Sequence, residues 1–128
     1  MSYYFATTLQ MAFGDAIERV TAELAKEGFG IISHIDVRDI LKKKLGIESR
    51  NYAILGACNP PYAFRAYQVD AHIGLLLPFN VILYEIEDGI VEVAAVDPEV
   101  TLQAAQNPAL ADISGPIRDR LRSVINRL

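Results

Sequence analysis

The residues best suited to chemistry lie where an apolar segment runs directly into a predicted helix. Cys58, the only cysteine of the chain, is followed by Asn59 and Pro60. Asn followed by Pro is typical of a helix cap and the first helical position. A thiol at a helix start feels the positive end of the helix dipole, which favours the reactive thiolate. Cys58 is therefore a candidate catalytic nucleophile or redox-active thiol.

The same corner also has a purely structural interpretation. Free cysteine is among the most buried residue types and packs as a small apolar side chain. In that case Cys58 fills a tight strand-to-helix corner, and Asn59 only caps the helix. A cysteine nucleophile needs an activating base, and none lies beside Cys58 in the sequence, although His34 could approach it in the fold. The sequence therefore leaves open whether the protein is an enzyme.

A second polar residue interrupts a later apolar segment. Asn80 follows Pro78 and Phe79 at the beginning of a predicted strand. A buried amide must find hydrogen-bond partners. It could satisfy a bulge or a neighbouring loop, or it could line a pocket with the Cys58 corner. We take Cys58, Asn59 and Asn80 as the candidate ligand-binding residues.

Motifs for metals and cofactors are missing from the sequence. The two histidines, His34 and His72, are far apart and have no metal-site spacing. There is no glycine-rich phosphate loop after a strand and no His-Glu-x-x-His motif. We predict neither a metal nor a cofactor.

The charge balance argues against two kinds of partner. The chain has 12 basic and 16 acidic residues and a net charge of −4. An acidic chain binds phosphate backbones poorly, so we expect no nucleic acid partner. The longest apolar run, residues 73–79, is far shorter than the roughly 20 residues that span a bilayer, so we expect no membrane partner.

Composition also suggests how the chain assembles and where it works. Hydrophobic residues make up 52% of the 128 residues, which is high for a small domain, and surplus apolar surface often forms a subunit interface. We therefore expect a homodimer. A single cysteine and no signal-peptide pattern favour the cytoplasm.

Apolar periodicity and turn residues outline one domain over residues 1–128. Asp36 and Gly46 bracket one predicted helix as its N-cap and its stop, and Asp88-Gly89 predicts a type I′ hairpin turn. Alternating strands and helices joined by a hairpin predict an α+β fold, a mostly antiparallel sheet with helices on one face. The predicted strands cover 2–8, 29–35, 50–58, 79–87 and 90–96, and the main helices cover 12–27, 36–46, 59–69 and 115–127.

Two motifs resemble a known family. Leu55-Gly56-Ala57-Cys58-Asn59-Pro60 and the later Leu77-Pro78-Phe79-Asn80 are similar, in this order, to the prokaryotic family called domain of unknown function 302. The resemblance covers essentially the whole chain. It implies a fold similar to that of the TATA-box-binding protein, a dimer, and no established activity. Many members carry a cysteine where this chain has Phe79, so an activity that needs two thiols is not expected here.

Three hypotheses follow. The leading one is a small-ligand- or partner-binding homodimer whose pocket lies where the Cys58–Asn59 corner meets Pro78 and Asn80. The alternative is a thiol-dependent enzyme or redox sensor that uses Cys58. The third is that both motifs only fix a turn and a dimer interface.

Overall fold

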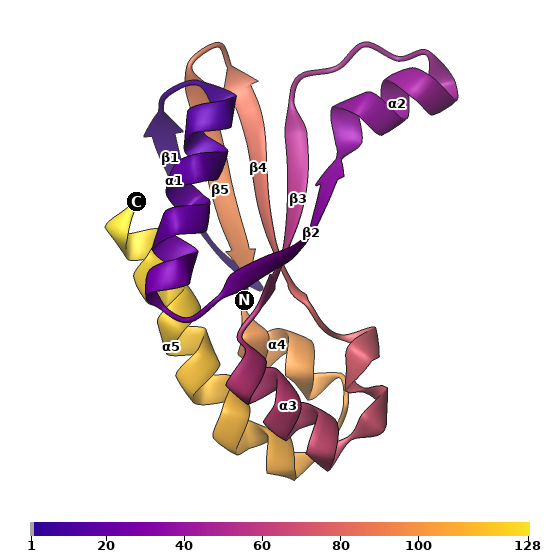
Figure 1. Cartoon of the computed structure of the whole chain (residues 1–128), viewed down its shortest axis with the longest axis vertical. Coiled ribbons are helices and arrows are strands. Elements are labelled where there is room, and N and C mark those ends of the chain that lie inside the picture. The colour runs from indigo at the N-terminus through magenta and orange to yellow at the C-terminus, as the bar shows by residue number, and fades with distance from the viewer. Residues whose placement is uncertain (1) are drawn as a thin grey trace.

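Five strands form a single antiparallel sheet in the computed structural model, which describes residues 2–128 (Figure 1). The strand order is β1-β5-β4-β3-β2, so the first strand pairs with the last. The predicted α+β fold with an antiparallel sheet is confirmed. In chain order the elements are β1 (Tyr4–Gln10), α1 (Phe13–Lys26), β2 (Gly30–Asp36), α2 (Val37–Leu45), β3 (Tyr52–Cys58), α3 (Pro60–Val69), the 3₁₀ helix η1 (Ala71–Leu75), β4 (Phe79–Glu87), β5 (Ile90–Val96), α4 (Pro98–Gln103), the 3₁₀ helix η2 (Pro108–Leu110) and α5 (Ala111–Arg127).

One face of the sheet carries the core. Successive strand residues point to opposite faces, and in β4 and β5 every second residue is buried against α1 and α5 (Figure 1). The alternate residues point to the opposite face. Among residues 2–128, no helix is long and apolar enough to cross a membrane. The core residues of the two strands are Phe79, Val81, Leu83, Val91, Val93 and Ala95.

Polar contacts within the chain's own turns define the ends of α2, as predicted, and the start of α4. The Asp36 carboxylate accepts a hydrogen bond from the Asp39 N–H at 3.0 Å, which caps α2. Gly46 ends the same helix with φ of +66°, a conformation that favours glycine. Asp97 caps α4 by accepting from the Glu99 N–H at 3.0 Å. These local signals need no tertiary partner, and the sequence therefore reveals them directly.

The turn between β4 and β5 differs from the predicted type I′ geometry. Gly89 has φ of +79°, but among residues 2–128 the only non-glycine residue with positive φ is Gln106. A type I′ turn needs positive φ at both central residues. Asp88, the first of the two, does not have positive φ, so the turn is not of type I′. The register instead shifts between Glu85 and Glu87, which indicates a bulge beside the turn.

The last helix begins earlier than predicted. The sequence predicts the last helix over residues 115–127. α5 instead begins at Ala111, directly after η2, and contains Pro116 within it. The side chain of Asn107 caps η2, accepting from the Ala109 N–H at 3.0 Å. The residue that caps this helical segment is therefore Asn107, at the start of η2, which leads directly into α5.

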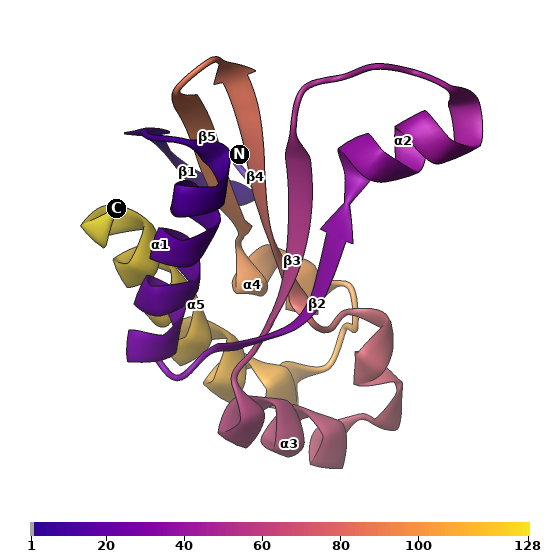
Figure 2. The same ribbon diagram turned by 45° about the horizontal axis from the view of Figure 1, so that its top comes forward.

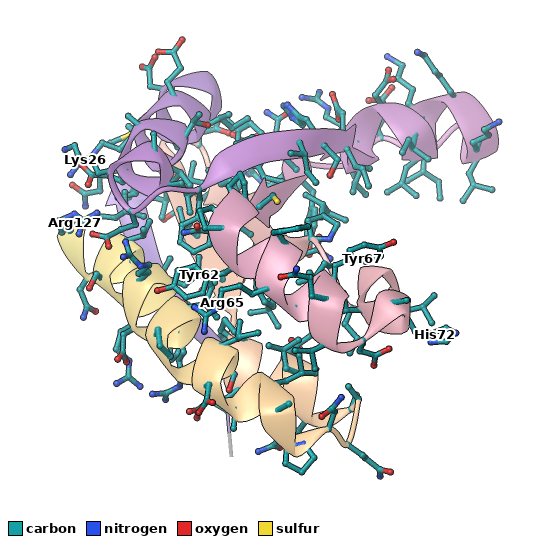
Figure 3. All side chains as sticks on the ribbon, turned by 60° about the horizontal axis from the view of Figure 1, so that its bottom comes forward. Lys26, Tyr62, Arg65, Tyr67, His72 and Arg127 are labelled. Atoms are coloured by element: carbon teal, nitrogen blue, oxygen red, sulfur yellow. The ribbon has the colours of Figure 1, made fainter. Side chains whose placement is uncertain are left out.

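Ion pairs link the C-terminal end of α5 to the C-terminal end of α1. The Glu23 carboxylate accepts from Lys26 Nζ at 2.9 Å and from Arg127 Nε at 2.8 Å, and these hydrogen bonds lower the pKa of Glu23 to about 2. Arg127 also donates to Glu27 at 2.8 Å. Lys26 and Arg127 accordingly lie side by side at one end of the helices (Figure 3). The two helices thus form a fixed pair against the sheet.

The helix α2 projects away from the other helices (Figures 1 and 2). None of its residues is buried, although apolar side chains recur along it. We call residues 32–47 the α2 arm. Its exposed large apolar residues are Ile32, Ile35, Ile40, Leu45 and Ile47.

Candidate functional site

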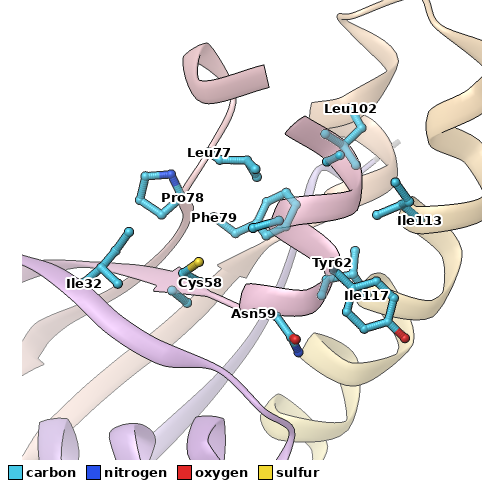
Figure 4. Close-up of a pocket in the computed structure, with 13 residues that line it drawn as sticks. Ile32, Cys58, Asn59, Tyr62, Leu77, Pro78, Phe79, Leu102, Ile113 and Ile117 are labelled. Atoms are coloured by element: carbon cyan, nitrogen blue, oxygen red, sulfur yellow. The ribbon is translucent and has the colours of Figure 1, made fainter. Parts of the chain in front are cut away.

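An apolar pocket of about 150 Å³ lies where the end of β3 meets α3, α4 and α5 (Figure 4). Ile32 and Pro78 lie at one end of it, and Ile113 and Ile117 at the other. Carbon atoms make up nearly all of its wall. Its lining residues are Ile32, Ala57, Cys58, Asn59, Tyr62, Ala63, Ala66, Leu77, Pro78, Phe79, Leu102, Ile113 and Ile117.

Small residues on α3 create the space. Ala63 and Ala66 are three positions apart and therefore share one helix face, and both line the pocket. Leucine or isoleucine at either position would fill much of the volume. Opposite them, Phe79 and Leu102 close the wall from β4 and α4. The pocket thus results from pairing a small-residue helix face with large apolar neighbours.

Cys58 is the last residue of β3 and is half-buried in the pocket wall. The helix that follows offers its thiol few N–H donors. Pro60 and Pro61 have no N–H, and the Ala63 N–H already donates to the Asn59 carbonyl at 2.9 Å. The dipole argument for a stabilised thiolate is therefore weaker than the position alone suggested.

Asn59 has a structural task that sequence reasoning missed. Its residue is 6% exposed, and its side-chain Nδ2 donates to the Glu27 carbonyl at 3.0 Å. It occupies the N-cap position of α3 without a side-chain capping bond, so the predicted cap is wrong in this respect. The Asn59 side chain bonds the Glu27 carbonyl, at the end of α1, instead of an N–H group of α3, because the fold brings that carbonyl beside it. Gly28 lets this loop approach, since a Cβ there would lie 3.1 Å from Asn59 Nδ2.

Asn80 lies away from this pocket. It is exposed in β4 between the buried residues Phe79 and Val81, and it pairs with Gly56 of β3. Strand alternation thus turns its amide to the face opposite the helices. There it lines other depressions of the surface. The structure therefore brings Cys58 and Asn59 together but not Asn80.

Aromatic and cationic groups surround one side of the pocket. The Tyr62 ring lines it, and the guanidinium groups of Arg65 and Arg120 lie 5.6 and 5.7 Å from the centre of that ring. Arg120 also donates to the Glu27 carbonyl at 3.3 Å. Figure 3 shows Tyr62 and Arg65 between α3 and α5. Spacing on α3 relates Tyr62 to Arg65, but no sequence signal relates either to Arg120.

The described residues contain no metal centre. Among residues 2–128, no three His, Cys, Asp or Glu side chains are grouped so that they could hold a metal ion. His72 lies beside Asp70 on the surface, at 3.5 Å. The chemistry available at the pocket is therefore that of apolar contact, one thiol and the neighbouring arginines.

The fold and the pocket define a small α+β domain with a five-stranded antiparallel sheet and an apolar pocket under its helices. The chain belongs to the family described as domain of unknown function DUF302, which matches residues 5–128. It is similar to a crystal structure of an uncharacterized conserved DUF302 protein from Bacillus stearothermophilus. The identity is 27%, the match covers 99% of this chain and 98% of the other, and the TM-score is 0.89. No curated protein matches the chain.

Proposed function

We propose that this protein binds a small apolar molecule, or the apolar end of a larger one, in the pocket beside Cys58. The observation that carries this proposal is the almost wholly apolar wall. The one buried amide in that wall, Asn59, already has the Glu27 carbonyl as its partner. Enclosed apolar cavities of about 150 Å³ bind benzene or xenon, and this pocket has a similar volume and a similarly apolar wall, although it opens to the surface beside Ile32.

Pocket size limits the ligand. Sites for drug-sized molecules usually measure about 300–1,000 Å³, and this pocket measures about 150 Å³. It therefore accepts one ring or a short branched chain. A longer ligand would extend past Ile32, which lines the pocket and is 63% exposed.

Filling the pocket should weaken this binding. We expect Ala63→Leu to weaken binding of benzene at least about tenfold, or about 1.4 kcal/mol, because the added carbons occupy the ligand's place. Ala22→Leu, at an exposed position of α1, is the matched control and should bind like the wild type. Chemical shifts of the Ala66 and Ile117 methyl groups during a benzene titration measure the binding. Equal affinity in both variants, or no saturable shift in the wild type, would refute the proposal.

The alternative of a thiol-dependent enzyme or redox sensor has less support. It rests on the position of Cys58 in the pocket wall, and the two prolines that open α3 remove donors that would stabilise a thiolate. A thiol in an apolar wall is also consistent with ligand contact alone.

We also propose that the protein is a homodimer in the cytoplasm and that the α2 arm forms the subunit interface. An isolated helix of nine residues is marginal in water, and α2 has no buried residue of its own. Leu45 is 66% exposed. Isoleucines extend the apolar surface from β2 through α2, and a two-fold axis would bury this surface against its own copy.

Charges on the α2 arm should break the dimer. We expect the wild type to elute with twice the 14.1 kDa mass of the chain, and the double variant Ile40→Glu, Leu45→Glu to elute as a monomer. Phe64→Glu, at an exposed position of α3, should remain dimeric. Size-exclusion chromatography with light scattering gives the masses. A wild type that is monomeric at all concentrations, or a double variant that is still dimeric, would show that the arm is not the interface.

A further inference from the structure

A second depression lies on the face of the sheet opposite α1 and α5. Strand alternation places tyrosines, an amide and one carboxylate there, from four different strands. The depression measures about 490 Å³, and we call it the tyrosine groove. Among residues 2–128, no lysine or arginine lines it. Its lining residues are Tyr3, Tyr4, Tyr52, Asn80, Ile82, Tyr84, Glu92, Ala94, Ala95 and Val96.

The aromatic rings of the groove are arranged in pairs. Tyr52 and Tyr84 pair across β3 and β4, and their rings stack with centres 5.6 Å apart and planes 18° from parallel. Tyr3 and Tyr4 meet edge to face, with centres 5.1 Å apart. Because Tyr52 and Tyr84 stack, each covers one face of the other, and only the outer faces of this pair, together with the rings of Tyr3 and Tyr4, are available within the depression.

One carboxylate fixes the charge of the groove. The Tyr84 hydroxyl donates a hydrogen bond to the Glu92 carboxylate at 2.6 Å, and the two residues are paired in the β4–β5 register. This hydrogen bond, followed by burial, raises the pKa of Tyr84 to about 12. Tyrosine phenols are neutral at physiological pH even at their ordinary pKa of about 10, so the charge of the groove is the negative charge of Glu92.

These features select the chemical class of a ligand. Tyrosine faces attract cations through the ring quadrupole, and cages of several aromatic residues recognise quaternary ammonium groups. For a metal ion, by contrast, no three His, Cys, Asp or Glu side chains are grouped suitably among residues 2–128. We propose that the tyrosine groove binds a small organic cation of the quaternary ammonium class, held by the outer ring faces of the stacked Tyr52 and Tyr84 and by the charge of Glu92.

Ligand charge gives the first test. Choline and its neutral carbon isostere, 3,3-dimethylbutan-1-ol, have the same shape and differ in charge. In a ¹⁵N chemical-shift titration at constant ionic strength, choline should produce saturable shifts at Tyr52, Tyr84 and Glu92 and should bind roughly 3- to 30-fold tighter than the alcohol. Equal binding of the two, or no saturable shift with choline, overturns the proposal.

Two substitutions in the groove test whether choline binds there, one by removing the charge and one by removing a ring. Glu92→Gln keeps the shape and an acceptor for Tyr84 but removes the charge, and Tyr52→Leu removes one ring face. Each should weaken choline binding roughly 3- to 30-fold, while Glu18→Gln, at an exposed position of α1, should leave it unchanged. Unchanged binding in both groove variants would place the choline elsewhere and overturn the proposal. Because the groove and the apolar pocket share no residue, this result does not depend on the benzene titration.

Discussion

Phe79→Ala should lower the free energy of unfolding by about 4 kcal/mol. The Phe79 side chain is only 6% exposed and belongs to the main core cluster. Its ring also forms part of the pocket wall (Figure 4). Removing the ring loses its burial and joins the new space to the pocket, so the neighbours have little opportunity to collapse around it. Urea unfolding measures the change.

A matched aromatic residue provides the control for this prediction. Phe64 of α3 is 62% exposed, and Phe64→Ala should change the unfolding free energy by no more than about 0.5 kcal/mol. Benzene should partly rescue the Phe79→Ala variant, which means that it stabilises the variant by more than it stabilises the wild type at the same concentration, because the wild-type pocket also binds benzene but is smaller. Similar losses in the two variants, or no rescue, would mean that Phe79 does not separate core from pocket.

Gly56→Ala should lower the free energy of unfolding by about 2–3 kcal/mol. A Cβ at Gly56 would collide with Ser33 Oγ and would lie 2.7 Å from Cγ of Pro78. The serine hydroxyl can rotate away, but the proline ring cannot move without its backbone. Because Pro78 lines the pocket, the same substitution should also weaken benzene binding.

Gly30 is the control for Gly56. It lies in the neighbouring strand β2, and a Cβ there would have no atom within 4 Å. Gly30→Ala should therefore be neutral or slightly stabilising. Urea unfolding of both variants gives the two free energies of unfolding. If Gly30→Ala lowers the free energy of unfolding as much as Gly56→Ala does, the effect comes from replacing a strand glycine and not from close packing against Gly56.

The sequence revealed those parts of the fold that depend on short-range contacts. Asp36 and Gly46 bracket α2 through bonds within their own turn, and the strands on either side of Asp88-Gly89 follow from alternation. Asn59 could not be predicted in the same way. Its true partner, the Glu27 carbonyl, reaches it only through the packing of α1 against the β3–α3 corner.

The sequence predicted the candidate site only in part, because several of its contacts also form only in the folded chain. Cys58 and Asn59 do line a pocket, but Asn80 points to the opposite face because its strand neighbours Phe79 and Val81 occupy the core. The contributions of Ala63, Leu102 and Ile117 required the tertiary arrangement. The tyrosine groove was missed because its residues come from four strands and share no local pattern.

The most direct test of the central claim is a crystal structure of the wild-type protein soaked with benzene. We expect ring density between the Ala63–Ala66 face of α3 and the side chains of Phe79 and Ile117, with those side chains in their present positions. A pocket without such density at saturating benzene, in crystals where the pocket is clear of neighbouring molecules, would contradict the assignment of this pocket as a ligand site.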